Sequence, residues 1–231
     1  MFNNTKISAV ISAFNEEKYI GNVVETVLES DFFDEIAVID DGSTDKTRDI
    51  LKKFSVYKNI KIFTFKHNKG KSHAMIKGVK RTSGKIIVFF DADIIGLNKH
   101  HIQQLIMPLI NGAADITIGH PTENIFDEKL NPFQFIAGER AVFRKDIMPI
   151  VKKLRATKYG IETMLNLYYK SLNKKIKIVY LRGLIHPIKL KKEKFSSALK
   201  NYIFEGFCIA KTVVLNYGLV LAVFKRLIFR D

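Results

Sequence analysis

The sequence predicts an α/β fold with a mostly parallel central sheet flanked by helices. In the first half of the chain, short apolar runs typical of buried strands alternate with amphipathic helical stretches, and the connections are short. Strands that alternate with helices pair in parallel through right-handed crossovers. The 231 residues are 47% hydrophobic and include 18 Phe, which supplies the core of one domain and excludes disordered, collagen-like and low-complexity classes.

Local patterns predict the elements of the first half. The strand runs are apolar and rich in β-branched residues, whereas the helices carry apolar residues at i, i+3, i+4 and i+7, as from Ile20 to Leu28. Ser43 or Thr44 can cap the second helix. We expect strands at residues 7–13, 35–40, 59–65 and 85–90, and helices at residues 16–30, 45–54 and 71–82.

The second half alternates less regularly. Residues 121–131 are polar and are expected to form a loop, and residues 195–229 have an amphipathic helical pattern that is interrupted near Gly218. We expect helices at residues 98–110 and 159–172, and short strands at residues 115–119, 133–137, 176–180 and 184–188.

The net charge of +15 is concentrated in the last two-fifths of the chain. Residues 1–139 hold 17 Lys and Arg against 18 Asp and Glu, a balance of −1, whereas residues 140–231 hold 21 against 5, a balance of +16. Such asymmetry indicates an anionic partner, which could be nucleic acid, an acidic membrane surface or a phosphorylated substrate. A lysine-rich surface that is merely solvated is the alternative.

The single cysteine, Cys208, excludes a disulfide framework and a cysteine-based zinc site, and it indicates a reducing compartment. The first residues lack a basic region followed by an uninterrupted apolar core, so we expect no signal peptide and a cytoplasmic location. The apolar stretch at residues 212–224 contains Asn216 and is shorter than the roughly 20 residues of a membrane span. Its aromatic and basic flanks suit a helix lying on an anionic membrane surface, or alternatively a helix that packs on the domain or on another copy.

Polar clusters follow each of the four expected strands of the first half. Ligands of open α/β sheets bind beyond the carboxyl ends of the strands. We therefore expect these clusters to meet along one edge of the sheet and to form the site. They are residues 14–16, 40–43, 67–71 and 91–93.

Two carboxylates, Asp91 and Asp93, can hold a hard divalent cation beside phosphate oxygens, although Asp93 could instead cap a helix. The acidic turn at residues 40–45 can accept hydrogen bonds from a base or a ribose, or can simply connect strand to helix. Gly70 and Lys71 open a helix whose N-terminus favours anions. Neither a P-loop nor a dinucleotide-binding glycine pattern is present.

Three segments together resemble glycosyltransferase family 2, whose members have the GT-A fold. They are ISAFNEEKYIGNVVETVL, EIAVIDDGSTDKT and HNKGKSHAMIKGVKRTSGKIIVFFDADI, and the resemblance is strong over residues 7–95 and weaker to about residue 190. It lies nearest to polyprenyl-phosphate glycosyltransferases and to glucosyl-3-phosphoglycerate synthase-like members. The resemblance implies a domain at residues 1–194, with a nucleotide-binding half (1–95) and an acceptor half (96–194), followed by a basic, aromatic helical segment at 195–231.

The resemblance also implies roles for residues of the first half. A nucleotide-diphospho-sugar, with UDP or GDP as its nucleotide, would bind across the strand edge. Asp91 and Asp93 would hold Mg²⁺ or Mn²⁺ on its diphosphate, and the cation would stabilise the charge of the leaving group, which gives Asp93 a catalytic role. The residues implied in nucleotide-sugar binding are Ala13, Asn15, Glu16, Asp41, Gly70, Lys71, Asp91 and Ala92.

In the second half, the segment around Glu139 and Arg140 resembles the loop over the sugar, and Glu139, Arg140 or Arg144 would contact the acceptor. The family's catalytic aspartate corresponds to Glu162, with Ile161 in place of a preceding acid. Glu162 would be the general base for a hydroxyl acceptor, or would orient the sugar if the acceptor is a phosphate. His186 would be a third metal ligand, or alternatively a structural histidine.

We therefore expect a metal-dependent glycosyltransferase that moves a sugar to a lipid-linked or phosphorylated acceptor, with inversion, because no carboxylate is clearly placed as a nucleophile. Retention of configuration is the alternative, because a similar Tyr-Gly-x-Glu loop occurs in retaining GT-A enzymes that resemble glucosyl-3-phosphoglycerate synthase. A nucleotidyltransferase would need a glycine-rich basic loop after the first strand, and residues 13–17 are acidic instead. A nucleic-acid-binding module using the basic half would leave Asp91 and Asp93 unexplained, so no nucleic-acid partner is expected. An inactive member acting as a scaffold is the remaining alternative, and the oligomeric state is left open.

Overall fold

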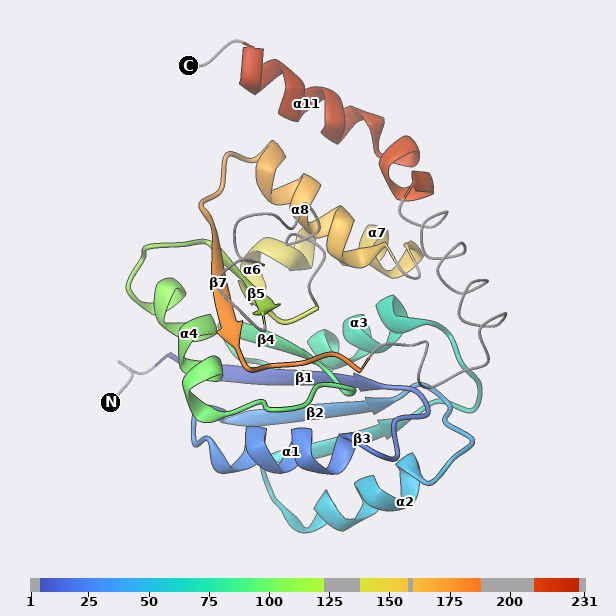
Figure 1. The fold of residues 1–231 in the computed structure, drawn as a ribbon. Coiled ribbons are helices and arrows are strands. Elements are labelled where there is room, and N and C mark those ends of the chain that lie inside the picture. Colours follow the sequence, from blue (N-terminus) through green and yellow to red (C-terminus); the bar gives the residue numbers. More distant parts are fainter. Residues whose placement is uncertain (1–4, 123–137, 158–159, 188–209, 229–231) are drawn as a thin grey trace.

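The computed structural model of the chain describes residues 5–122, 138–157, 160–187 and 210–228. These residues form a seven-stranded sheet in the order β3-β2-β1-β4-β6-β5-β7, with helices on both faces (Figure 1). The strands are β1 (Ile7–Ala13), β2 (Glu35–Asp40), β3 (Ile60–Thr64), β4 (Ile86–Asp91), β5 (Ile116–Thr122), β6 (Arg140–Phe143) and β7 (Ile176–Arg182). Of these seven strands, only β6 runs antiparallel to its neighbours, β4 and β5, so the expected α/β fold with a mostly parallel sheet is confirmed.

Helices cover the two faces of the sheet and bury two separate apolar layers. In β1, Ile7, Ala9 and Ile11 face the layer beneath α1 and α4, whereas Val10 faces the layer beneath α3, α7 and α8. Figure 1 shows α1 and α2 on one side of the sheet and α3, α7 and α8 on the other. The helices are α1 (Ile20–Glu29), α2 (Thr47–Lys52), α3 (Lys71–Arg81), α4 (Lys99–Ile110), α6 (Arg144–Ile147), α7 (Val151–Ala156), α8 (Ile161–Ser171) and α11 (Tyr217–Ile228), with 3-10 helices η1 (Lys53–Val56) and η3 (Met148–Ile150).

Most differences from the expected elements lie in the second half. The sequence patterns missed β6, α6 and α7, because a strand of four residues followed by short helical turns has too little periodicity to be recognised. The strand expected at residues 184–188 is wrong: Ile185 forms only an isolated bridge with Ile95. The strand expected at residues 133–137, and most of the loop at 121–131, lie outside the described residues, whereas β5 continues to Thr122.

The C-terminal part is helical from residue 210 to residue 228, with a turn at Asn216, close to the interruption expected near Gly218. Here α11 packs against α8, and Leu219 is partly buried against the apolar layer of that side (Figure 1). Among the described residues, no helix is long and apolar enough to cross a membrane. The predicted boundary between a domain at residues 1–194 and a segment at 195–231 falls outside the described residues and stays a prediction.

Parallel pairing brings the polar clusters of the first half to one edge of the sheet. Ala13 of β1 pairs with Asp40 of β2, and Ser12 pairs with Asp91 of β4, so these three strands end level with one another. The backbone amide of Asp41 then donates to the carbonyl oxygen of Ala13 at 2.8 Å. The predicted meeting of these clusters at the carboxyl ends of the strands is confirmed.

Candidate active site

The loops that follow β1 and β2 are joined through the side chain of Asn15. The side-chain Oδ1 of Asn15 accepts a hydrogen bond from the backbone amide of Thr44 at 2.8 Å, and the backbone amide of Asn15 donates to Ser43 Oγ at 2.9 Å. The amide of Glu16 donates to Thr47 Oγ1 at 2.8 Å. Asn15 and Glu16 therefore shape the edge at which a nucleotide is expected, and Ala13 lies at the end of β1 beneath them.

Asp41 fixes the loop that leads into α3. Its carboxylate is only 3% exposed and accepts hydrogen bonds from the amides of Lys69 and Gly70, both at 2.8 Å. Burial raises the pKa of Asp41, although these two amides oppose the rise. Both oxygens are thus engaged by backbone in this structure, and the predicted contact of Asp41 with a base stays a prediction.

Lys71, the first residue of α3, joins two carboxylates that come from opposite parts of the chain. Its Nζ lies 2.7 Å from Asp91 Oδ1 at the end of β4, and 2.8 Å from Glu162 Oε1 in the first turn of α8. Burial lowers the pKa of Lys71, but the two carboxylates outweigh it and the pKa is raised. The sequence predicted Lys71, Asp91 and Glu162 for the site, but it did not predict the two ion pairs that join them. The tertiary packing of α8 brings Glu162 to Lys71, and no local pattern indicates this.

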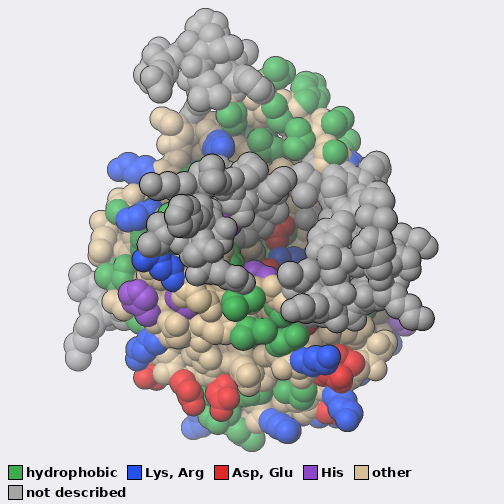
Figure 2. All heavy atoms as spheres, viewed as in Figure 1, with side chains coloured by type: hydrophobic (Ala, Val, Ile, Leu, Met, Phe, Trp, Pro, Cys, Tyr) green, Lys and Arg blue, Asp and Glu red, His purple; other side chains and the backbone are tan. Residues whose placement is uncertain are grey.

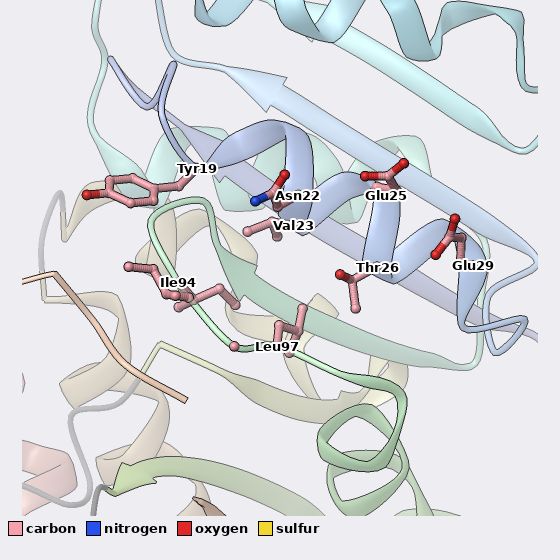
Figure 3. A pocket seen from close by; sticks show the side chains of 10 residues that line it. Tyr19, Asn22, Val23, Glu25, Thr26, Glu29, Ile94 and Leu97 are labelled. Atoms are coloured by element: carbon pink, nitrogen blue, oxygen red, sulfur yellow. The ribbon is translucent and has the colours of Figure 1, made fainter. Parts of the chain in front are cut away.

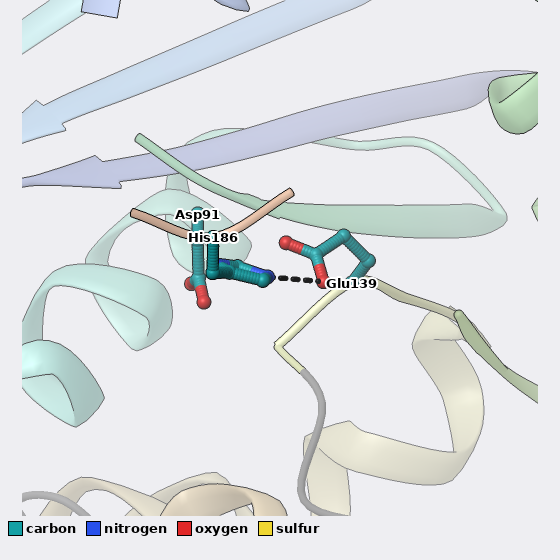
Figure 4. A group of neighbouring side chains, drawn as sticks. All are labelled: Asp91, Glu139 and His186. Atoms are coloured by element: carbon teal, nitrogen blue, oxygen red, sulfur yellow. Dashed lines mark hydrogen bonds and ion pairs between the residues drawn. The ribbon is translucent and has the colours of Figure 1, made fainter. Parts of the chain in front are cut away.

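His186 follows β7 and lies between two further carboxylates. Its Nδ1 is 3.6 Å from Asp93 Oδ1, and its Nε2 is 3.2 Å from Glu139 Oε2 (Figure 4). Burial lowers the pKa of His186, but Glu139, Asp93 and Asp91 outweigh it and raise the pKa to about 11. The structure thus brings His186 and Asp93 together, as expected for two ligands of one cation.

These side chains suit a divalent cation. Asp91, Glu139 and His186 offer ligand atoms that all lie within 4.8 Å of one another, and Figure 4 shows the three side chains grouped beside the end of β4. Oε1 of Glu139 is buried and has no hydrogen-bond partner among the described residues, so the group carries buried negative charge that a nearby cation would balance. Carboxylate oxygens with one imidazole nitrogen fit Mn²⁺ well and Mg²⁺ less well. The donor set therefore fits the cation that the sequence predicted.

Gly138 allows the chain to pass directly over Asp91. A Cβ atom on Gly138 would lie 2.1 Å from Asp91 Oδ2, so a larger residue could not occupy this position without displacing the carboxylate. Ala92, the middle residue of the Asp-Ala-Asp motif, is buried in the apolar layer at 3% exposure. Its predicted contact with the nucleotide-sugar stays a prediction, as do the roles of Gly70 and Lys71.

The two arginines predicted for the acceptor are both engaged within the fold. Arg140 is fully buried in β6, where Nη1 donates to Asn166 Oδ1 at 3.4 Å. Burial lowers the pKa of Arg140, and the carboxylates of Glu162, Asp91 and Glu139 oppose this. Arg144 donates to the carbonyl oxygen of Val79 and so connects the end of β6 to α3. Their predicted contact with an acceptor stays a prediction.

Comparison with known proteins decides the family. The family model described as Glycosyl transferase family 2 matches residues 8–177, which is most of the chain.

The chain belongs to glycosyltransferase family 2.

The chain is also similar to curated proteins, one of which is a named glycosyltransferase. The chain is 34% identical over 137 residues to the UDP-N-acetylglucosamine–dolichyl-phosphate N-acetylglucosaminyltransferase of Methanococcus voltae, covering 51% of this chain and 53% of that one. It is 36% identical over 123 residues to an uncharacterized protein of Methanocaldococcus jannaschii, covering 51% and 47%. The chain thus spans about half the length of these relatives.

The structure also resembles glucosyl-3-phosphoglycerate synthase from Mycobacterium tuberculosis in complex with Mn²⁺, UDP and glucosyl-3-phosphoglycerate. The TM-score is 0.73 at 21% identity, over 93% of this chain and 81% of that one. At this identity the likeness shows the fold. The recognition of glycosyltransferase family 2 from the sequence is confirmed by the family model.

Proposed function

We propose that this family 2 glycosyltransferase is metal-dependent and moves a sugar from a UDP-sugar to a phosphorylated acceptor. The observation that carries the proposal is the group of carboxylates with one imidazole, from Asp91, Asp93, Glu139 and His186, beside the loops predicted to hold the nucleotide. A divalent cation held there supplies Lewis-acid stabilisation of the charge that develops on the nucleoside diphosphate. Asp93 and His186, with Asp91 beside them, are the residues that would hold it.

The named ligands of similar proteins support the choice of donor and acceptor. The Mycobacterium tuberculosis neighbour is described with UDP and Mn²⁺ or Mg²⁺, and the Methanococcus voltae relative is named for a UDP-sugar. Their acceptors, phosphoglycerate and dolichyl phosphate, share a phosphate group. A phosphate also suits the +16 balance of residues 140–231, and a lipid-linked acceptor would deliver it at a membrane.

The arrangement of carboxylates favours a single displacement, which we propose to proceed with inversion. Lys71 engages Asp91 and Glu162, whereas His186 engages Glu139 and lies beside Asp93. Among the described residues of the site, no carboxylate stands apart as a nucleophile for a double displacement. In this proposal Glu162 accepts a proton from an acceptor hydroxyl, or orients the sugar if the acceptor is itself a phosphate.

A nucleotide panel tests the donor and the metal together. The melting temperature is measured with UDP, GDP, CDP or dTDP, each with Mn²⁺ and with EDTA. A ligand at 100 times its Kd stabilises by about 2.7 kcal/mol, which corresponds to roughly 5–10 °C for a chain of this size. We expect UDP with Mn²⁺ to give this shift and EDTA to abolish it.

Each other outcome of the panel has a definite meaning. A shift with GDP instead of UDP would replace the proposed donor. A shift that persists in EDTA would contradict metal dependence. If a well-folded protein responds to none of the nucleotides, the transferase proposal fails in favour of a scaffold without activity.

We further propose that the helical C-terminal part lies on an anionic membrane surface. Tyr217 and Leu221, one turn apart on α11, are 70% and 52% exposed and form an apolar stripe, and Val214, which precedes the turn at Asn216, is 70% exposed. The described part of the domain leaves these three side chains uncovered. Figure 2 shows hydrophobic side chains gathered over this region, at the upper right. Exposed Lys211 stands near the stripe, and a cation close to an anionic surface contributes about 1 kcal/mol.

Co-sedimentation with phosphatidylglycerol vesicles tests this attachment. We expect Leu221→Asp combined with Tyr217→Asp to reduce binding at least tenfold, because two charges enter the apolar stripe. Val56→Asp is the matched control, since Val56 is 77% exposed in η1, away from α11. Equal binding of the double variant and the wild type would contradict the proposal.

A further inference from the structure

The imidazole of His186 is held at both of its nitrogens, and the two contacts differ. Nε2 lies 3.2 Å from Glu139 Oε2, within hydrogen-bond distance, whereas Nδ1 lies 3.6 Å from Asp93 Oδ1. Figure 4 shows the ring edge directed at the carboxylate of Glu139. One nitrogen is therefore occupied by a protein acceptor, and the other faces the carboxylate predicted to hold the cation.

Glu139 is fixed in place by the strands on either side of it. Its side chain is 0% exposed, and its carbonyl oxygen accepts a hydrogen bond from the amide of Gly119 in β5 at 2.8 Å. The preceding residue, Gly138, packs directly on Asp91. A carboxylate this deeply buried is unsuited to meet an acceptor substrate, which was the role the sequence resemblance implied, but it can hold a neighbouring ring in one orientation.

We propose that Glu139 is a positioning residue that orients His186 toward the divalent cation. A hydrogen bond from Nε2–H to the Glu139 carboxylate fixes the tautomer in which Nδ1 carries the lone pair, and it turns Nδ1 toward Asp93. Metal-binding histidines commonly donate their other N–H to a carboxylate in this manner. The inference rests on the proposed metal dependence of the enzyme, and it assigns to Glu139 a role distinct from that of a ligand.

The first experiment measures Mn²⁺ binding by electron paramagnetic resonance in the presence of UDP. Glu139→Met keeps approximate size and removes the acceptor, whereas Glu139→Gln keeps an oxygen that can accept from Nε2–H. We expect the Met variant to bind Mn²⁺ about 10–100-fold more weakly and the Gln variant to remain within a few-fold of the wild type. Glu25→Gln, a change at an exposed glutamate of α1, is the control.

Electron spin echo envelope modulation separates positioning from direct ligation, because coordinated imidazole nitrogen modulates the Mn²⁺ signal. We expect nitrogen modulation in the wild type, its loss in His186→Ala, and a reduced amplitude in Glu139→Met. Full modulation with weakened affinity in Glu139→Met would make Glu139 a ligand instead. Unchanged affinity and modulation would remove any role for Glu139 at the metal.

A measurement on the wild type alone covers the case in which the buried variants fail to fold. Nitrogen-15 chemical shifts of His186, recorded with UDP and diamagnetic Mg²⁺, report which nitrogen carries the proton. We expect a protonated Nε2 and a metal-shifted Nδ1, and the reverse assignment would overturn the proposal. If UDP and Mn²⁺ or Mg²⁺ do not bind the wild type at all, the proposed function itself fails, which is a different result.

Discussion

Replacing Asp93 by asparagine is expected to lower kcat/KM for sugar transfer about 10²–10³-fold while the fold is retained. The substitution would keep the size of the side chain but remove the charge that faces His186 and the predicted cation. The side chain of Asp93 is 21% exposed and stands beyond the end of β4, so it adds little to the core. Activity is assayed with the donor that the nucleotide panel selects, at saturating Mn²⁺.

The controls for this variant separate charge loss from general damage. Asp49→Asn removes a charge from α2, where the carboxylate is 72% exposed and paired with Lys52. This variant should keep full activity and melt within about 2 °C of the wild type, because surface changes are usually within ±0.5 kcal/mol. Asp93→Asn should keep a cooperative melting transition. If Asp93→Asn turns over at the wild-type rate, the assignment of Asp93 to the metal is wrong.

Replacing Glu162 by glutamine is expected to reduce kcat about 10²–10⁴-fold, the range for loss of a general base, with little effect on UDP binding. Glu162 lies on α8, and the loops predicted for the nucleotide follow β1, β2 and β3. Lys71 keeps its ion pair with Asp91 at 2.7 Å in this variant, so its ammonium does not become an unpaired buried charge. Steady-state kinetics and a UDP titration measure the two effects separately.

Two comparisons complete the test of Glu162. Glu29→Gln alters the exposed end of α1 and should leave kcat unchanged. Proton NMR of the wild-type product gives its anomeric configuration, which we expect to be opposite to that of the donor. A variant whose kcat holds while KM for the acceptor rises would assign Glu162 to acceptor binding instead of proton transfer, and retained configuration would contradict inversion.

The half of the site built by parallel strands could be predicted from sequence because its determinants are local. A run such as residues 7–13 indicates a buried strand by itself, and the polar residues after each strand then meet at one edge as a consequence of parallel pairing. Asp91, Asp93 and Lys71 were found in this way. Family resemblance added Glu162 and His186, which no local pattern indicates.

The other half depends on tertiary placement. Strand β6 lies antiparallel between β4 and β5. This position places Glu139 next to Nε2 of His186 and buries Arg140. A strand of only four residues shows too little periodicity to be predicted from sequence. Glu139 was therefore assigned to the acceptor from resemblance alone. The strand expected at residues 184–188 is wrong for a related reason. Its apolar residues indicated a strand, but within the described part of this segment only Ile185 pairs, in an isolated bridge with Ile95 outside the strands of the sheet.

That single bridge between Ile95 and Ile185 has a thermodynamic consequence for the cation. Each residue donates its amide to the other's carbonyl oxygen at 2.9 Å, two residues beyond Asp93 and one residue before His186. A Cβ on Gly96 would lie 2.4 Å from the carbonyl oxygen of Gly183, so the two loops also touch at backbone level. Fixing the backbone of one residue costs about 1–2 kcal/mol of conformational entropy. Folding itself orders the two loops that carry Asp93 and His186, so this loss does not occur when a cation binds. The spacing of Asp93 and His186, the two proposed ligands, is therefore set by the backbone before a cation binds, so coordination need not supply this ordering energy.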